Sequence, residues 1–260
     1  MRVGGHTSCV ALAHDGRPVS LVLDAGTGIR RVTHELGGNA FDGTLLLTHL
    51  HWDHVQGLPF FAAGDRDDSR VRVLIPEQTH LDGRAHDAAG VLALAMSPPH
   101  FPIGPDGLRG DWRFESLPPG SHRIEEFDVL AFDVPHKGGR TYGFRITDGA
   151  ASIAYIPDHC PEPGTAPRIA RECAGVDLLV HDAQFLEPER AVADLYGHAT
   201  VGDALELAER CGASTLALFH HAPARSDDDV DAIGHAAVAA GAERGFSVVV
   251  AREEQAMSLG

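Results

Sequence analysis

The sequence has few cysteines, few basic residues and no long apolar run, and each shortage excludes a class of protein. The four cysteines are widely separated and form no C-x-x-C pair, which argues against a zinc ribbon and a thioredoxin-like redox motif. Only 21 Lys and Arg oppose 37 Asp and Glu, so the formal net charge is -16, and no basic run is present. Because nucleic-acid affinity depends on many basic contacts to phosphate, we expect no nucleic-acid polymer as a partner.

The apolar residues do not indicate a membrane protein. No apolar run approaches the roughly 20 residues that span a bilayer, and the first five residues lack the apolar core of a secretory signal. We therefore expect a soluble cytoplasmic protein with no membrane partner. The chain has 260 residues, 43% of them hydrophobic, which predicts a single domain over residues 1–260. The sequence leaves the oligomeric state open, a homodimer included.

Histidine, the commonest metal ligand, is abundant, with 17 residues in the chain. Four ligand-type residues, His49, His51, Asp53 and His54, follow an apolar run at 44–47 in an H-x-H-x-D-H pattern. Two histidines two apart on an extended segment can chelate one ion, and the next Asp and His can reach a second. Catalytic zinc uses such ligands and keeps a position for water. A histidine-rich surface turn is the alternative, which so dense a pattern after a buried-type strand disfavours.

Short β-branched or leucine-rich runs, bounded by Gly, Asp or Pro, predict strands along the whole chain. They lie at residues 10–13, 19–23, 44–47, 71–75, 129–134, 142–147, 152–156, 178–180, 215–219 and 247–250. Two helices are predicted, one capped by Thr200 and ended by Gly212, the other capped by Ser226 and ended by Gly241. Both helices lie between strands, as in an α/β protein.

Residues 97–120 interrupt this order, because they contain six prolines, four glycines and the aromatic residues Phe101, Trp112 and Phe114. We interpret them as a long irregular loop, and loops of this length are often functional. One hypothesis is a lid that faces the substrate. The alternative is an ordered surface loop whose aromatic side chains complete the core.

Residues 49–54 resemble the metal-binding motif of the metallo-β-lactamase-fold hydrolases, and the resemblance covers nearly the whole chain. It implies an α/β fold in the form of a four-layered αββα metallo-β-lactamase sandwich. It also implies two divalent metal ions that share a bridging hydroxide. We expect zinc, with manganese or iron as alternatives, because imidazole sites bind several ions.

The same resemblance implies three further ligands, each after a later strand. His136 matches the third histidine of the first ion, Asp158 the carboxylate that bridges both ions, and His220 the last histidine of the second ion. The neighbouring His221 competes with His220, which we prefer because it comes first after the apolar run at 215–219.

Two other segments resemble the HEAT and HST motifs of ribonuclease Z and its phosphodiesterase relatives. They are Leu-Leu-Val-His-Asp-Ala-Gln-Phe at 178–185 and Gly-His-Ala-Thr at 197–200. The resemblance implies that Asp182 and His198 pass a proton to the leaving oxygen, and with Asp53 they are the expected catalytic residues. The alternative is that His198 only packs before the helix while Asp182 only bonds the backbone.

The spacing of the ligands narrows the expected substrate. Only 21 residues separate His136 from Asp158, which leaves no room for the flexible tRNA-binding arm of ribonuclease Z. We therefore expect a phosphodiesterase that acts on a small molecule, a cyclic nucleotide being one candidate. A lactone or carboxylic-ester hydrolase with the same ligands is the alternative. A tRNA endonuclease and an inactive binding protein fit less well. An iron redox enzyme also fits less well, because diiron relatives usually have Glu where His51 stands.

Overall fold

The computed structural model describes residues 2–79, 84–85 and 87–260. The chain divides into two compact units, which we call the N-terminal unit (His6–Pro119) and the C-terminal unit (Met1–Gly5 with Gly120–Gly260). Each unit contains one sheet and its own helices. The single domain expected for residues 1–260 stays a prediction.

The N-terminal unit is built on a five-stranded sheet in the order β1-β2-β3-β4-β5, in which β2 to β5 run parallel. Its strands are β1 (Val10–Leu12), β2 (Leu21–Leu23), β3 (Asp42–Leu46), β4 (Arg70–Pro76) and β5 (Asp111–Leu117). Its helices are α1 (Ile29–Glu35), α2 (Trp52–Val55) and α3 (Ala88–Ala93), with short 3₁₀ turns at η1 (Leu58–Phe60) and η2 (Pro105–Gly107). The sheet and these helices share one apolar core, which includes Val22, Ile29 and Leu45.

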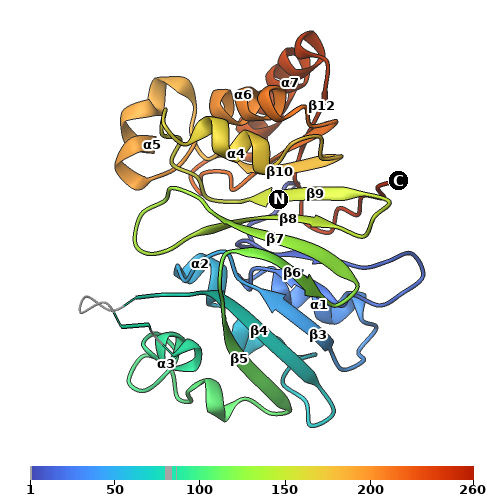
Figure 1. Ribbon diagram of the computed structural model, residues 1–260, viewed down its shortest axis with the longest axis vertical. Helices are drawn as coiled ribbons and strands as arrows, with labels where there is room; N and C mark the ends of the chain where they lie inside the picture. The colour runs from blue at the N-terminus through green and yellow to red at the C-terminus, as the bar shows by residue number, and fades with distance from the viewer. Residues whose placement is uncertain (1, 80–83, 86) are drawn as a thin grey trace. The chain divides into compact units, whose positions relative to one another are not determined.

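The C-terminal unit is built on a seven-stranded sheet in the order β12-β11-β10-β9-β8-β7-β6. Its strands are β6 (Gly120–Ile124), β7 (Phe127–Asp133), β8 (Tyr142–Thr147), β9 (Ser152–Ile156), β10 (Leu178–Asp182), β11 (Thr215–Phe219) and β12 (Ser247–Val250). Its helical segments are α4 (Ala166–Glu172), η3 (Glu187–Glu189), α5 (Arg190–Tyr196), α6 (Val201–Cys211) and α7 (Asp227–Arg244). Helices α4, α6 and α7 pack on the sheet through a second core, with Ile169, Ala208 and Ala237 in contact with strand residues (Figure 1).

The predicted strands are all present, and those at 142–147, 152–156, 215–219 and 247–250 have the predicted bounds. Helix α6 follows its Thr200 cap and ends at Gly212 as expected. Helix α7 is longer than predicted and continues past Gly241 to Arg244. Gly241 therefore lies inside the helix, where a Cβ atom would come within 2.4 Å of Val248 Cγ2, so that glycine allows close packing on β12.

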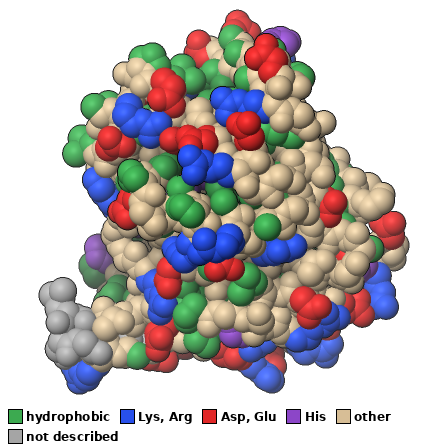
Figure 2. Space-filling view, turned by 45° about the horizontal axis from the view of Figure 1, so that its top comes forward, with side chains coloured by type: hydrophobic (Ala, Val, Ile, Leu, Met, Phe, Trp, Pro, Cys, Tyr) green, Lys and Arg blue, Asp and Glu red, His purple; other side chains and the backbone are tan. Residues whose placement is uncertain are grey.

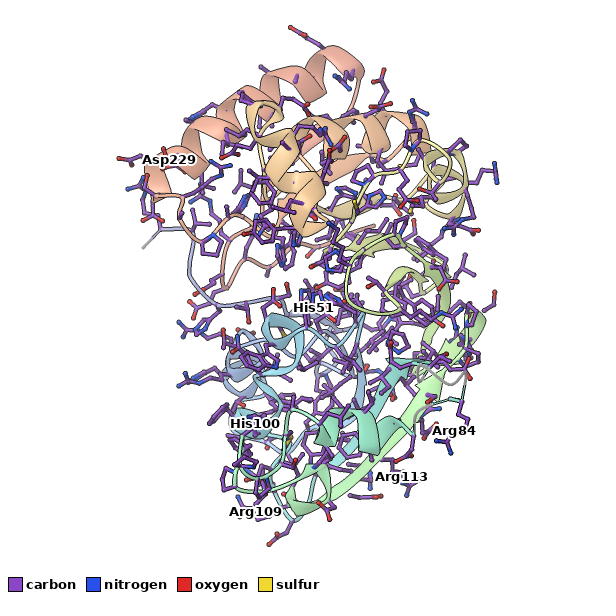
Figure 3. The ribbon with its side chains drawn as sticks, turned by 90° about the vertical axis from the view of Figure 1, so that its left-hand side faces the viewer. His51, Arg84, His100, Arg109, Arg113 and Asp229 are labelled. Carbon is purple, nitrogen blue, oxygen red and sulfur yellow. The ribbon has the colours of Figure 1, made fainter. Side chains whose placement is uncertain are left out.

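The prediction of one irregular loop over residues 97–120 is wrong for its second half. Residues 111–117 form β5, which pairs with β4 along its whole length. Trp112 and Phe114 stack at 6.0 Å between ring centroids and pack against the apolar core. In Figure 3, Arg109 and Arg113 lie at the opposite end of the N-terminal unit from His51. The structure therefore supports the alternative for Trp112 and Phe114, whose side chains complete the core.

Replacing Trp112 by alanine is expected to lower the free energy of unfolding by about 2–3 kcal/mol. The indole packs on the core, and its Nε1 donates hydrogen bonds to the carbonyl oxygens of Gly64 (3.0 Å) and Arg109 (2.8 Å). Denaturant unfolding would measure the change. Activity should fall to the same extent on large and small substrates, whereas a selective loss on large substrates would restore the lid hypothesis.

No helix in the described part of the chain is long and apolar enough to cross a membrane.

Candidate metal site

The four ligand-type residues of the H-x-H-x-D-H motif are brought together at the end of β3. His51 is the extended N-cap residue directly before α2, and Figure 3 shows its place in the N-terminal unit. The ring centroid of His49 lies 4.4 Å from that of His51 and 4.2 Å from that of His54. Asp53 Oδ2 lies 3.5 Å from His54 Nε2. A compact cluster of imidazole and carboxylate groups of this kind suits a divalent transition metal such as zinc.

Asp24, to which the sequence assigned no role, orients two of these histidines. The residue is fully buried, and its Oδ2 lies 2.8 Å from His54 Nδ1. The hydroxyl of Thr48 donates to Asp24 Oδ1 at 2.9 Å and lies 3.0 Å from His49 Nδ1. Holding Nδ1 in this way fixes the ring and presents Nε2 as the ligand atom. Asp24 is therefore a positioning residue for the cluster.

The turn after β2 places Asp24 at this point. Because β2 and β3 are parallel neighbours, with Leu23 opposite Leu46, the residues that follow them meet at one edge of the sheet. Gly26 lies so close to the next segment that a Cβ atom would come within 2.2 Å of the Asp53 carbonyl oxygen. Glycine at this position of the turn is therefore needed for the close approach.

The C-terminal unit brings a second set of predicted residues together at strand ends. Asp158 follows β9, Asp182 ends β10 and His220 follows β11, and these three strands are parallel. His136 follows β7, which has the same direction because β8 is antiparallel to both β7 and β9. The carboxyl ends of parallel strands share one edge of a sheet, as in other α/β proteins.

Asp158 is the centre of this second set. One carboxylate oxygen, Oδ2, lies 3.4 Å from His136 Nε2, and the other, Oδ1, lies 3.4 Å from His220 Nε2. His136 Nδ1 lies 2.6 Å from the Gly197 carbonyl oxygen, which fixes its tautomer with Nε2 as the ligand atom. A carboxylate with a different imidazole at each oxygen has the arrangement expected of a group that bridges two ions.

Asp182 holds His198 against this cluster. Asp182 is fully buried, and its Oδ2 lies 2.9 Å from His198 Nδ1 while it accepts the backbone N–H groups of His159 (3.0 Å) and Ala199 (3.1 Å). The His198 ring stacks on the His220 ring at 5.1 Å between centroids. A carboxylate at Nδ1 orients the ring and leaves Nε2 as the atom that can serve a general acid.

His198 also has the position of a possible ligand. One ligand atom each from Asp158, His198 and His220 lie within 4.8 Å of one another. The geometry in the C-terminal unit therefore allows His198 two roles, proton donor or metal ligand, and metal analysis of a variant separates them.

Two buried histidines that the sequence did not single out lie behind this set. His159 Nδ1 is 2.9 Å from His181 Nε2, and His181 Nδ1 is 2.7 Å from the Asp182 carbonyl oxygen. Burial lowers the pKa of both rings, that of His159 most strongly. Both are therefore neutral at physiological pH and act as a packed hydrogen-bonded support for residues 158 and 182. Each directly neighbours one of these residues in the sequence, which is the signal that could have found them.

His220 and His221 have different surroundings in the structure. His220 has a left-handed backbone (φ 56°), and its Nε2 is directed at Asp158. His221 is largely enclosed, and burial, with the charges of His220 and Arg225, lowers its pKa to about 4. The left-handed residue turns the chain at the end of β11, so that only His220 faces Asp158 in the C-terminal unit.

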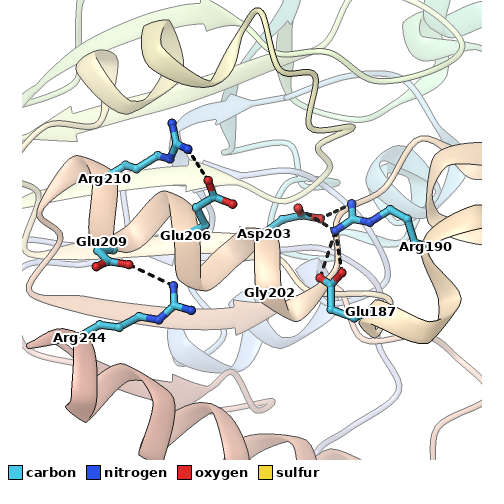
Figure 4. A pocket seen from close by; sticks show the side chains of 8 residues that line it. All are labelled: Glu187, Arg190, Gly202, Asp203, Glu206, Glu209, Arg210 and Arg244. Carbon is cyan, nitrogen blue, oxygen red and sulfur yellow. Dashed lines mark hydrogen bonds and ion pairs between the residues drawn. The ribbon is translucent and has the colours of Figure 1, made fainter.

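A surface depression of about 730 Å³ lies elsewhere in the C-terminal unit, beside α5, α6 and α7 (Figure 4). Its charged side chains pair with one another, for example Arg190 with Asp203 and Arg244 with Glu209. Its lining residues include none of the predicted metal ligands. The Arg190 pairs hold α5 against the N-terminal cap of α6, close in sequence to His198.

The chain belongs to the beta-lactamase superfamily, because the model of the beta-lactamase superfamily domain matches residues 20–221. The fold and the clustered His and Asp residues are those of a metal-dependent hydrolase with divalent metal ligands. The chain is 28% identical to ribonuclease Z of Nocardia farcinica in an alignment of length 248 that covers 77% of each protein. It is 28% identical to ribonuclease Z of Pyrobaculum arsenaticum over 226 residues, covering 77% of this chain and 75% of the relative. These relatives confirm the resemblance to the ribonuclease Z branch.

Solved structures confirm the metallo-β-lactamase fold. The metallo-beta-lactamase fold protein YhfI from Bacillus subtilis has a TM-score of 0.62 at 18% identity, covering 97% of this chain and 95% of that one. The short form of human tRNase Z has a TM-score of 0.64 at 19% identity, covering 98% and 93%. At these identities the likeness concerns the fold alone.

The expectation that no nucleic-acid polymer is a partner is contradicted by these relatives, which are named as ribonucleases. The error came from the net charge, which sums over the whole chain and does not describe the surface near the site. Figure 2 shows Lys and Arg side chains next to Asp and Glu side chains on the visible face. Local basic groups can contact phosphate even when the total charge is -16.

Proposed function

We propose that the protein is a phosphodiesterase that uses two divalent metal ions, zinc being the expected metal. The seven proposed ligands are His49, His51, Asp53, His54, His136, Asp158 and His220. His49, His51 and His136 would hold one ion, and Asp53, His54 and His220 the other, with Asp158 bound to both. The donor set of each unit fits this assignment, because it contains imidazole rings fixed through Nδ1, those of His54, His49 and His136.

The observation that carries the phosphodiester assignment is the Asp182–His198 pair beside Asp158 and His220. Bound ions would activate water and offset the negative charge of the phosphate. His198 would donate its proton to the leaving alcohol, while Asp182 keeps Nδ1 oriented. A lactone or ester hydrolase has less need of this pair, since metal ligands alone can serve attack on a carbonyl carbon.

Two classes of phosphodiester substrate are compatible with this proposal, and a different observation favours each. A small phosphodiester such as a cyclic nucleotide is favoured by the short connection between His136 and Asp158, which consists mainly of β8 and β9. RNA is favoured by the relatives named ribonuclease Z, of which the chain covers about three quarters in the examples above. Both substrates present the same phosphodiester to the residues around Asp158.

The test is a substrate panel with the purified, zinc-loaded protein. Bis(4-nitrophenyl) phosphate, a cyclic nucleotide, an RNA with a 3′ extension and a set of lactones would be compared at equal metal content. We expect hydrolysis of at least one phosphodiester and two metal ions per chain by elemental analysis. Turnover of lactones without turnover of any phosphodiester would contradict the proposal, and two iron ions per chain would favour the redox alternative.

A further inference from the structure

Trp52 is an exposed aromatic residue placed directly between two proposed metal ligands. It is the first residue of α2, preceded by His51 and followed by Asp53. Its exposed fraction is 71%, although tryptophan is among the most buried residues on average. By contrast, His54 and Val55, which follow in the same helix, are buried. The core of the N-terminal unit therefore does not use the indole.

A second exposed aromatic lies in the same segment, and it makes a useful contrast. Phe60, at the end of η1, is 57% exposed, but its ring packs edge to face against Phe101 at 5.9 Å between centroids. Part of that ring is already used within the unit. The indole of Trp52 presents a larger open surface, and the Cα atom that carries it lies only about 3.8 Å from those of the ligands on either side.

We propose that Trp52 is a stacking platform for the nucleobase of a nucleotide whose phosphate is held by the metal ions. This inference rests on the proposed function and specifies the substrate class of that site. Every nucleobase has a flat π surface that stacks on indole, and such stacking tolerates any base. The nucleobase can belong to a mononucleotide or to the end of an RNA chain, since both present the same ring beside a phosphate.

The test compares ligands that share the phosphate and differ in the base. AMP and inorganic phosphate would be used as inhibitors of bis(4-nitrophenyl) phosphate hydrolysis, with wild type, Trp52→Ala and Trp52→Phe. Stacking of one base is worth about tenfold to a hundredfold in affinity, so Trp52→Ala should weaken inhibition by AMP to that extent. Inhibition by phosphate should not change, and Trp52→Phe should restore part of the AMP affinity. A short oligoribonucleotide in place of AMP shows whether the base of an RNA end binds more tightly than that of a mononucleotide.

Tryptophan fluorescence gives a readout that does not depend on turnover. The chain has two tryptophans, and Trp112 is packed against the core with its Nε1 hydrogen-bonded. AMP added to the zinc-loaded protein should quench the emission of wild type, and the quenching should disappear in Trp52→Phe. Val238→Ala, which trims another exposed apolar side chain on α7, is the matched control and should behave as wild type.

Several outcomes would overturn the proposal. Equal affinity for AMP in wild type and Trp52→Ala would show that the indole does not meet the base. A parallel loss for AMP and phosphate, with a reduced metal content, would show that the substitution only disturbs the neighbouring ligands. A change in the sedimentation of the protein with unchanged AMP affinity would make Trp52 a contact between copies of the chain. If neither AMP nor phosphate binds the metal-loaded protein, the proposed function itself is wrong.

Discussion

Replacing His198 by alanine should lower turnover of a phosphodiester with an alkyl leaving group by about 10²–10⁴-fold, the usual contribution of general acid catalysis. An alkoxide is a poor leaving group and needs the proton that His198, held by Asp182 at 2.9 Å, can donate. A nitrophenolate departs without a proton, so the loss should be much smaller with that substrate. Steady-state kinetics on the two substrates with one enzyme preparation would measure the difference, independently of metal loading.

Two results would contradict the role of His198 as a general acid. His198 lies within ligand range of Asp158 and His220, so a loss of one metal ion in the variant would identify it as a ligand. An equal loss of turnover on both substrates with full metal content would identify it as a positioning residue. His235→Ala is the matched control, because this histidine is exposed on α7 and should leave both rates unchanged.

Replacing Asp24 by asparagine should weaken metal binding by about 10–100-fold, the usual effect of losing a carboxylate that orients a ligand. The variant keeps the size of the side chain but loses the charge that faces His54 Nδ1 and the Thr48 hydroxyl. Titration of the metal-free protein with zinc, against a competing chelator, would measure the affinity. Turnover at limiting zinc should fall by a similar factor and recover in part at high zinc.

The control for Asp24 is another aspartate of the same unit. Asp42 begins β3 and forms an exposed ion pair with Arg70, so Asp42→Asn should change zinc affinity little. If Asp24→Asn lowers the melting temperature but leaves zinc affinity as in wild type, Asp24 has only a structural role. That result would also remove the main support for a fixed His54 ring.

Much of the fold was predictable because apolar periodicity and turn residues act locally. Strands β8, β9, β11 and β12 were predicted with their observed bounds, and the caps of α6 and α7 were recognised from Ser or Thr followed three residues later by Asp. Strand β5 was missed, although its residues alternate between apolar and polar, because Pro and Gly flank it. Strand β6 was missed because it is a polar strand at the edge of the described sheet, beside β7.

The sequence by itself determined which residues are available as ligands and where along the chain they stand. The cluster at His49, His51, Asp53 and His54 was identifiable from its own pattern after a strand. His136, Asp158 and His220 were implied by the resemblance to the metallo-β-lactamase-fold hydrolases, each after a later strand. The proposed roles of Asp182 and His198 came from a resemblance in two short motifs.

Only the tertiary structure decided how those residues are held. Asp24 contacts His54, 30 residues later in the chain, because β2 and β3 are parallel neighbours. The residues next to Asp24 in the sequence do not indicate that contact. Asp182 reaches His198 in the same way, through the parallel strand β10 and the turn before α6. A carboxylate acquires such a role from the donors that surround it, and those donors come from segments that only folding brings together.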